Sequence, residues 1–88
     1  MLNLLSEEIK VILNFESQQV NVIKCKNDIV MKKILMDFAL QIKVEFTSLM
    51  FLHGGERISN FKQTFYQCMN EEDKKLKEIN ILVYKINK

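Results

Sequence analysis

Residues 48–58, with the sequence SLMFLHGGERI, decide how the rest of the chain is organised. They predict a short apolar strand, a tight turn and a second strand that leads away from the turn. The turn carries Gly54 and Gly55, the only two glycines of the chain, and glycine adopts a positive φ at little steric cost. In the first strand Leu49 and Phe51 share one face, because side chains alternate along a strand. The turn is therefore the pivot between a hairpin and helix upstream and a loop and closing strand downstream.

The chain upstream of this stretch predicts a β-hairpin. Residues 9–15 alternate as a strand does, and residues 16–19 form a short polar loop before a second strand at 20–25. Val22 and Ile23 are consecutive in that second strand, so strict alternation cannot place both on the core side. A bulge would allow it, and which residues of this strand face the core therefore stays open. The first strand has two distinct faces, with Ile9, Val11, Leu13 and Phe15 on one and Lys10, Ile12 and Asn14 on the other.

An amphipathic helix of about 15 residues follows the hairpin. Asn27 and Asp28 supply side chains that favour the N-cap position before it. Its apolar residues recur at spacings of three and four and form one stripe: Met31, Ile34, Leu35, Phe38 and Ile42. A helix of that length spans about 22 Å, so it can cover one face of a small sheet.

An irregular segment and one last strand follow the glycine turn. Residues 71–78 carry seven charges in eight positions and predict a solvated loop or a short helical turn. Nearly every residue of 79–86 is apolar, as expected of a strand in the middle of the sheet, beside the first strand. Four residues of the mixed segment 60–70 are candidates to cover the edge of the core: Phe61, Phe65, Tyr66 and Met69.

This order of elements predicts one α+β domain at 9–86, with a β-grasp sheet of about four or five strands and one long helix packed across it. Residues 1–8 are expected to be a frayed or loosely packed extension.

Thirteen basic and 11 acidic residues give a net charge of +2, which favours neither nucleic acid nor an anionic membrane as a partner. The sequence shows no apolar run of the length that a signal peptide or a membrane span needs. We therefore expect a monomer in the cytoplasm or nucleus, with both cysteines reduced.

Catalytic chemistry is not expected from the side chains present. His53, the only histidine, is expected to be a solvated residue of the turn. A nucleophilic pair would need Cys25 or Cys68 within hydrogen-bond reach of it. Cys25 is expected on the core side of the second strand, and Cys68, whose path the sequence does not place, is expected to be a small buried residue. One histidine and two separated cysteines fall short of a zinc site, so no enzyme activity, cofactor or metal is expected.

The chain resembles the ubiquitin-like family, most closely around residues 48–58, which match the small ubiquitin-like modifier pattern Ser-Leu-x-Phe-Leu-x-x-Gly-x-Arg-Ile without a gap. The resemblance covers roughly residues 9–85, with 60–78 the weak part, where an insertion is needed. Positions that correspond to the family core are Cys25, Met31, Ile34, Phe38, Phe51 and Ile58. The resemblance implies a ubiquitin-like β-grasp fold. Conjugated members end in Gly-Gly, whereas this sequence ends at Lys88 without one, so we expect a protein that is not conjugated.

The resemblance also implies a binding surface on the outward face of the third and fifth strands. Its central aliphatic residue corresponds to Leu52, and the last strand contributes Leu82 and Asn80. Asn80 stands where ubiquitin has a histidine, and Glu16 where it has a leucine, so the usual ubiquitin receptors are not expected to bind.

Independently of the resemblance, the alternation of the strands leaves a cluster of apolar side chains on the solvent side: Ile12, Met50, Leu52, Leu82 and Tyr84. Such a cluster exceeds scattered apolar residues and indicates a contact surface, unless residues 1–8 or a neighbouring chain cover it. The first hypothesis is a non-conjugated interaction module whose partner is a receptor of ubiquitin-like domains or its own parent protein. The alternatives are a conjugatable modifier with a Gly-Gly tail outside this sequence, and a β-grasp domain that pairs with a small GTPase or scaffold through a sheet edge.

Overall fold

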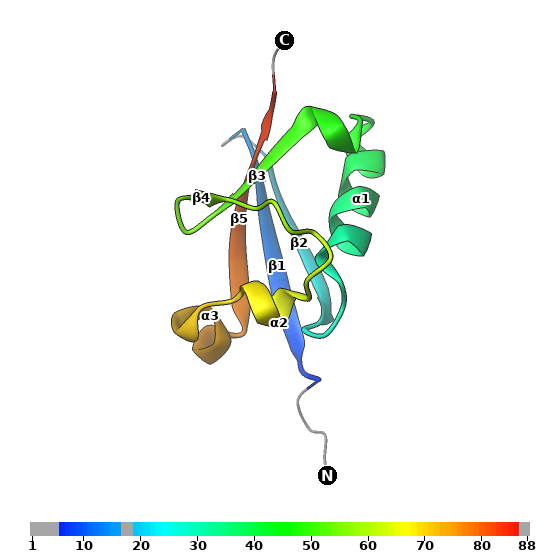
Figure 1. Ribbon diagram of the computed structural model, residues 1–88. Helices are drawn as coiled ribbons and strands as arrows, with labels where there is room; N and C mark the ends of the chain where they lie inside the picture. The colour runs from blue at the N-terminus through cyan, green and yellow to red at the C-terminus, as the bar shows by residue number, and fades with distance from the viewer. Residues whose placement is uncertain (1–5, 17–18, 87–88) are drawn as a thin grey trace.

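The computed structural model describes residues 6–16 and 19–86, which form a five-stranded mixed sheet with one long helix across it (Figure 1). In chain order the elements are β1 (Glu8–Phe15), β2 (Gln19–Lys26), α1 (Met31–Ile42), the 3₁₀ helix η1 (Phe46–Ser48), β3 (Leu49–His53), β4 (Glu56–Arg57), α2 (Phe65–Cys68), α3 (Glu71–Leu76) and β5 (Glu78–Lys85). The strand order across the sheet is β2-β1-β5-β3-β4. The central pair β1 and β5 is parallel and the other neighbours are antiparallel. The predicted α+β class and the central position of the last strand are confirmed.

The β1–β2 hairpin pairs without interruption from Glu8 opposite Lys26 to the loop end of both strands. The suggested bulge is therefore wrong. Ile23 lies opposite Val11 and packs against the core, whereas Val22 lies opposite Ile12 on the other face. Two consecutive apolar residues need no bulge here, because only Ile23 faces the core, while Val22 stays 55% exposed on the outward face.

The hydrophobic core lies between α1 and the sheet. Its largest fully buried side chains are Phe38, Phe51, Phe65, Leu13, Met31, Leu35, Ile79, Ile81, Val11 and Val83. The strand residues in this set alternate with exposed or half-buried ones, and the helix residues belong to the predicted stripe. Burial of apolar side chains at about 25 cal/mol per Å² is the main stabilising term of such a core.

The N-terminus of α1 differs from the prediction. The helix begins at Met31, and its N-cap is Val30, which makes no side-chain capping bond. Asn27 is instead buried, with 4% of its surface exposed, and its Oδ1 accepts a hydrogen bond from the Glu7 N–H at 3.2 Å. The side chain expected to cap the helix therefore ties the chain before β1 to the end of β2.

Backbone groups from a distant segment take over the capping of α1. The Met31 N–H donates to the Gln63 carbonyl at 2.9 Å, and the Lys32 N–H donates to the Phe61 carbonyl at 3.0 Å. The first N–H groups of a helix lack partners within the helix, so this loop satisfies two of them. At its other end α1 stops at Lys43, whose φ of 61° is left-handed.

The glycine turn forms as predicted. Gly54 has φ 61° and Gly55 has φ 83°, and a Cβ at either position would meet no atom within 4 Å. The turn therefore requires glycine at these positions because of the positive φ angles, and not because a side chain would collide with a neighbour. The turn reverses the chain between His53 and Glu56, which pair across β3 and β4.

The segment after the turn covers one end of the core. Phe65 and Met69 are buried and Phe61 is half-buried against them, as expected for residues that close the core edge. Tyr66, the fourth candidate, is 42% exposed and is not part of the core cluster; it lies under the Lys74 ammonium group, 4.3 Å from its ring centroid. The charged segment forms the short helix α3, as the prediction of a short helical turn allowed, and most of its residues are exposed, whereas only 15% of the Asp73 side chain is exposed.

No helix among the described residues is long and apolar enough to cross a membrane.

Candidate functional site

The outward face of the sheet presents apolar side chains over four strands. Residue pairing places Leu52 opposite Leu82, and Met50 opposite Tyr84, all on the face away from α1. Ile12 lies beside Asn80, where β1 and β5 run parallel. The six predicted binding residues therefore share one face. Two valines of β2 extend this face, and we call the whole set the outer sheet surface: Ile12, Val20, Val22, Met50, Leu52, Asn80, Leu82 and Tyr84.

Exposure differs along the outer sheet surface. Leu82 is 39% exposed, Val22 is 55% exposed and Val20 is 60% exposed. Asn80 is exposed as well, and the other four members are half-buried by their neighbours in the sheet. The sequence did not predict the two valines because the register of β2 was open. Once Ile23 is known to face the core, alternation along the strand places both valines on the outward face.

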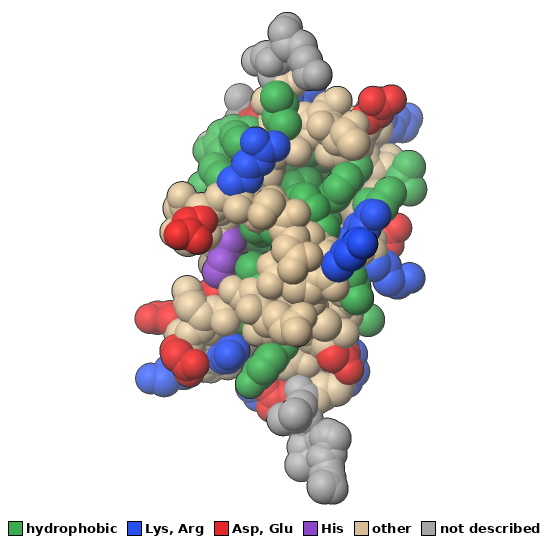
Figure 2. All heavy atoms as spheres, viewed as in Figure 1, with side chains coloured by type: hydrophobic (Ala, Val, Ile, Leu, Met, Phe, Trp, Pro, Cys, Tyr) green, Lys and Arg blue, Asp and Glu red, His purple; other side chains and the backbone are tan. Residues whose placement is uncertain are grey.

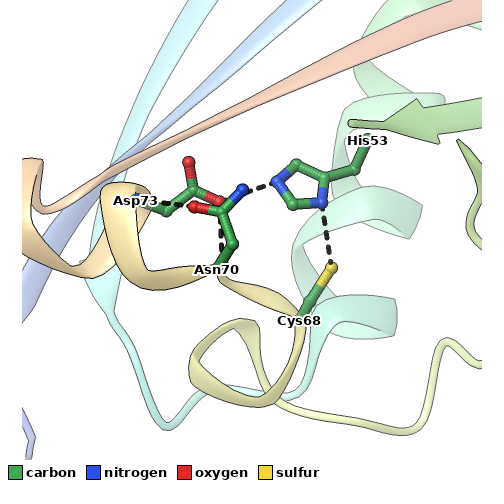
Figure 3. A network of polar contacts seen from close by, with 4 residues as sticks. All are labelled: His53, Cys68, Asn70 and Asp73. Carbon is green, nitrogen blue, oxygen red and sulfur yellow. Dashed lines mark hydrogen bonds and ion pairs between the residues drawn. The ribbon is translucent and has the colours of Figure 1, made fainter. Parts of the chain in front are cut away.

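A second cluster lies on the opposite, core-facing side of β3. His53 follows Leu49 and Phe51 on this side of the strand, at the point where the strand leaves the core. Its Nε2 lies 2.7 Å from Oδ2 of Asp73 in α3, and its Nδ1 lies 3.8 Å from Sγ of Cys68 in α2 (Figure 3). We call these three residues the Cys–His–Asp cluster.

The start of α3 fixes the position of the carboxylate in this cluster. Asn70 is the N-cap, and its Oδ1 accepts from the Asp73 N–H at 2.8 Å. In return Asp73 Oδ2 accepts from the Asn70 N–H at 3.1 Å, which completes a capping box. The Asn70 N–H thereby holds the carboxylate that contacts His53, and the Asn70 side chain holds the backbone of the same residue.

Hydrogen bonding selects the tautomer of a neutral His53. A carboxylate oxygen only accepts hydrogen bonds, so the imidazole Nε2 carries a proton and donates it to Asp73. In the neutral ring Nδ1 has a free lone pair that can accept from the Cys68 thiol. Burial raises the pKa of the Cys68 thiol above its ordinary value, and the negative charge of Asp73 raises it further.

The expectation for His53 is therefore wrong. Only 13% of its side chain is exposed, and both ring nitrogens have partners. A thiol does come within reach of it, because α2 carries Cys68 back toward the end of β3. The alternation that placed Phe51 on the core side also places His53 on that side, and this signal could have identified His53 as a partly buried residue. The Asn70-to-Asp73 spacing of a capping box was a second signal.

Two further features bear on the choice of site. An apolar hollow lies between η1 and β4, where hydrophobic side chains are visible in Figure 2. Its walls include the rings of Phe46, Phe51 and Phe61, of which Phe61 meets the other two edge to face. In the part of the chain that the structure describes, no three side chains of the histidine, cysteine, aspartate or glutamate types gather as a metal-binding group.

Comparison with known proteins identifies the fold. No protein-family model and no curated protein matches the chain. Among solved structures, the ubiquitin-like domain of an Arabidopsis thaliana protein has a TM-score of 0.72 at 7% identity, covering 92% of this chain and 80% of that one. A second NMR structure of that Arabidopsis protein has a TM-score of 0.71 at 9% identity, covering 92% of this chain and 89% of that one. A protein designed de novo from ubiquitin has a TM-score of 0.64 at 10% identity, covering 92% of each chain. The chain therefore has the ubiquitin-like fold.

Proposed function

We propose that this protein is a ubiquitin-like interaction module that binds a partner protein without covalent attachment, through the outer sheet surface. The observation that supports this most is the number of apolar side chains on one face of the sheet. Leu82 and Leu52 are neighbours across β5 and β3, and Val22 and Ile12 are neighbours across β2 and β1. Asn80 and Asn14 stand between these two apolar pairs, since they lie opposite Ile12 and Leu82. Apolar groups gathered on one face of a small domain are typical of a protein contact.

The chemistry of the surface indicates what the partner must present. Leu82 and the two valines would accept apolar anchors, and Asn80 between them needs a hydrogen-bonding group. At one end of the same face charges of both signs meet, since Lys10 lies opposite Lys24 on β2 and opposite Glu78 on β5, so polar side chains at that end of the partner would be favoured. A receptor of ubiquitin-like domains and another segment of the parent protein both fit this description.

The role that we propose is binding and not catalysis, with no cofactor, in the cytoplasm or nucleus, by a monomeric domain. The half-buried members of the outer sheet surface are already partly covered by their neighbours, so the exposed members would lose most of the water on binding. Leu82 is exposed and lies at the centre of the surface. It is the expected hot spot, since central side chains that become fully desolvated carry most of the binding free energy.

Substitution of Leu82 tests the proposal. Leu82→Arg places a charge at the centre of the outer sheet surface and is expected to weaken partner binding at least about ten-fold. The unfolding temperature is expected to change little, because Leu82 contributes little to the core. Leu40→Arg is the matched control, since Leu40 is 75% exposed on α1, on the other side of the molecule. Partners captured from a lysate by the wild-type protein would be identified by mass spectrometry, and each purified partner titrated by calorimetry.

Two results would contradict the proposal. Equal binding by the wild type and Leu82→Arg would show that the surface is not the contact. Loss of binding by Leu40→Arg but not by Leu82→Arg would move the contact to the helix.

A second candidate rests on the free edge of the sheet. β2 is an edge strand of eight residues, and an edge strand can add a strand from a small GTPase or scaffold. Chemical-shift mapping with the partner separates the two candidates. Edge pairing would shift backbone amides along β2 and leave β3 and β5 unchanged, whereas binding at the outer sheet surface would shift β3 and β5 as well as β2.

A further inference from the structure

We propose that Cys68 is a site of covalent modification by small electrophiles, with His53 as the base that accepts the thiol proton and Asp73 as the residue that positions His53. The proposal is independent of partner binding, because the Cys–His–Asp cluster lies on the core-facing side of β3 and the outer sheet surface lies on the other. It combines side chains from three elements that the fold brings together: the end of β3, the end of α2 and the start of α3.

The geometry provides a path for the proton. His53 donates from Nε2 to Asp73 at 2.7 Å, so the lone pair on Nδ1 points toward Cys68 Sγ at 3.8 Å. When an electrophile reaches the sulfur, the thiol proton moves to Nδ1 and the sulfur lone pair forms the new bond. The bond to the leaving group breaks, and the leaving group departs with its electron pair. The imidazolium that results is stabilised by the Asp73 carboxylate and then loses its proton to water.

The surroundings favour a small, polar reagent. Cys68 and His53 line an open hollow of about 270 Å³ on the molecular surface. Its other walls are mostly polar or charged: Glu56, Arg57, Ile58, Ser59, Asn60, Gln63 and Gln67. A hollow of that size admits a small molecule but not a folded domain. The charged groups that face the imidazole and thiol are Asp73 from α3 and those of β4, where Glu56 pairs with His53.

Cys25 is an internal reference for the effect of the imidazole. Both cysteines are half-buried, and burial followed by a neighbouring acid raises the pKa of each thiol. The acid is Glu8 for Cys25 and Asp73 for Cys68. The chain has a single histidine, and both of its ring nitrogens are engaged by the cluster. An excess reactivity of Cys68 over Cys25 that disappears when His53 is replaced therefore reports on His53.

Alkylation of the full chain by iodoacetamide tests the proposal. The sulfur–carbon bond forms, the carbon–iodine bond breaks, iodide leaves, and the proton passes to His53. Peptide mass spectrometry would follow both cysteines in the same sample at pH 7. We expect Cys68 to react at least about ten-fold faster than Cys25, and His53→Gln to remove that advantage while the rate at Cys25 stays unchanged.

Asp73→Asn is the second variant. Its amide oxygen can still accept from His53 Nε2 but no longer stabilises the imidazolium by charge, so the Cys68 rate is expected to fall about three- to ten-fold. An unchanged Cys25 rate in each variant shows that the fold is intact. A Cys68 that reacts no faster than Cys25 in the wild type would overturn the proposal. So would a Cys68 rate that neither substitution lowers.

Discussion

At the scale of single residues, Asn27 shows how one side chain can act against its expected role. Both its side chain and its backbone bind Glu7: Oδ1 accepts from the Glu7 N–H, and the Asn27 N–H donates to the Glu7 carbonyl at 2.8 Å. Its own carbonyl accepts from the Tyr66 N–H at 2.9 Å. Asn27 thus joins the chain before β1 to the end of β2 and to α2. The preference of asparagine for N-caps is statistical, and here a tertiary contact prevails over it.

Replacement of Asn27 with alanine is expected to lower the free energy of unfolding by about 1–2 kcal/mol, because it removes the buried side chain whose Oδ1 accepts a hydrogen bond from the Glu7 N–H. Urea unfolding at neutral pH would measure the loss. Asn60→Ala is the control, since Asn60 makes an exposed hydrogen bond to the Lys62 N–H and its loss should cost less than about 0.5 kcal/mol. Equal losses in the two variants would show that Asn27 has no special structural role.

At the scale of elements, local sequence predicted those strands and helices that depend on local patterns. Alternation in β1 identified which residues face the core, and the spacing from Met31 to Phe38 identified the buried stripe of α1. The glycine turn followed from two residues that both adopt positive φ. These features could be predicted because each depends on neighbours in sequence.

Features that depend on distant segments were missed. The start of α1 is capped by carbonyl groups of Phe61 and Gln63, some thirty residues away, and no local pattern reveals such a cap. The Cys–His–Asp cluster was missed for the same reason. The path of 60–78 had to be known before Cys68 and Asp73 could be placed beside His53. The register of β2 likewise needed its partner strand.

The capping box of α3 gives a prediction at this scale. Asn70→Ala removes the acceptor of the Asp73 N–H, and we expect it to lower the free energy of unfolding by about 1 kcal/mol. Asn70→Ser is the matched variant, since serine can cap the helix and should restore most of the stability. Thermal unfolding followed by circular dichroism measures both. If alanine and serine were equally destabilising, the side-chain cap would not be what holds α3.

At the scale of the whole molecule, the sheet separates two kinds of surface. Its outer face carries side chains suited to contact with a protein, and its inner face carries the core and, where β3 ends, the Cys–His–Asp cluster. Leu52 and His53 are adjacent in sequence yet point to opposite sides, because successive residues of a strand alternate. Binding at one face and modification at the other can therefore occur in the same small domain without competition for side chains.

The two cysteines lead us to expect that the free energy of unfolding of the whole molecule decreases at alkaline pH. In the folded protein the pKa of each thiol is raised above its ordinary value of 9.0, first by burial and then by a neighbouring acid. The folded state therefore holds these protons more tightly than the unfolded state does. This contribution to stability is fully present below the ordinary pKa and is lost as the pH rises through the higher folded-state pKa.

The free energy of unfolding is accordingly expected to fall as the pH rises from about 8 to above 9, and to fall less in a protein that carries Cys25→Ala and Cys68→Ser. Neither replacement titrates in this range, and serine keeps a hydroxyl that can donate to His53 Nδ1. Urea unfolding of both proteins at a series of pH values measures the difference. All other side chains are the same in the two proteins, so their contributions cancel in the comparison. The same slope in the two proteins would contradict the prediction, since the thiols would then not contribute to it.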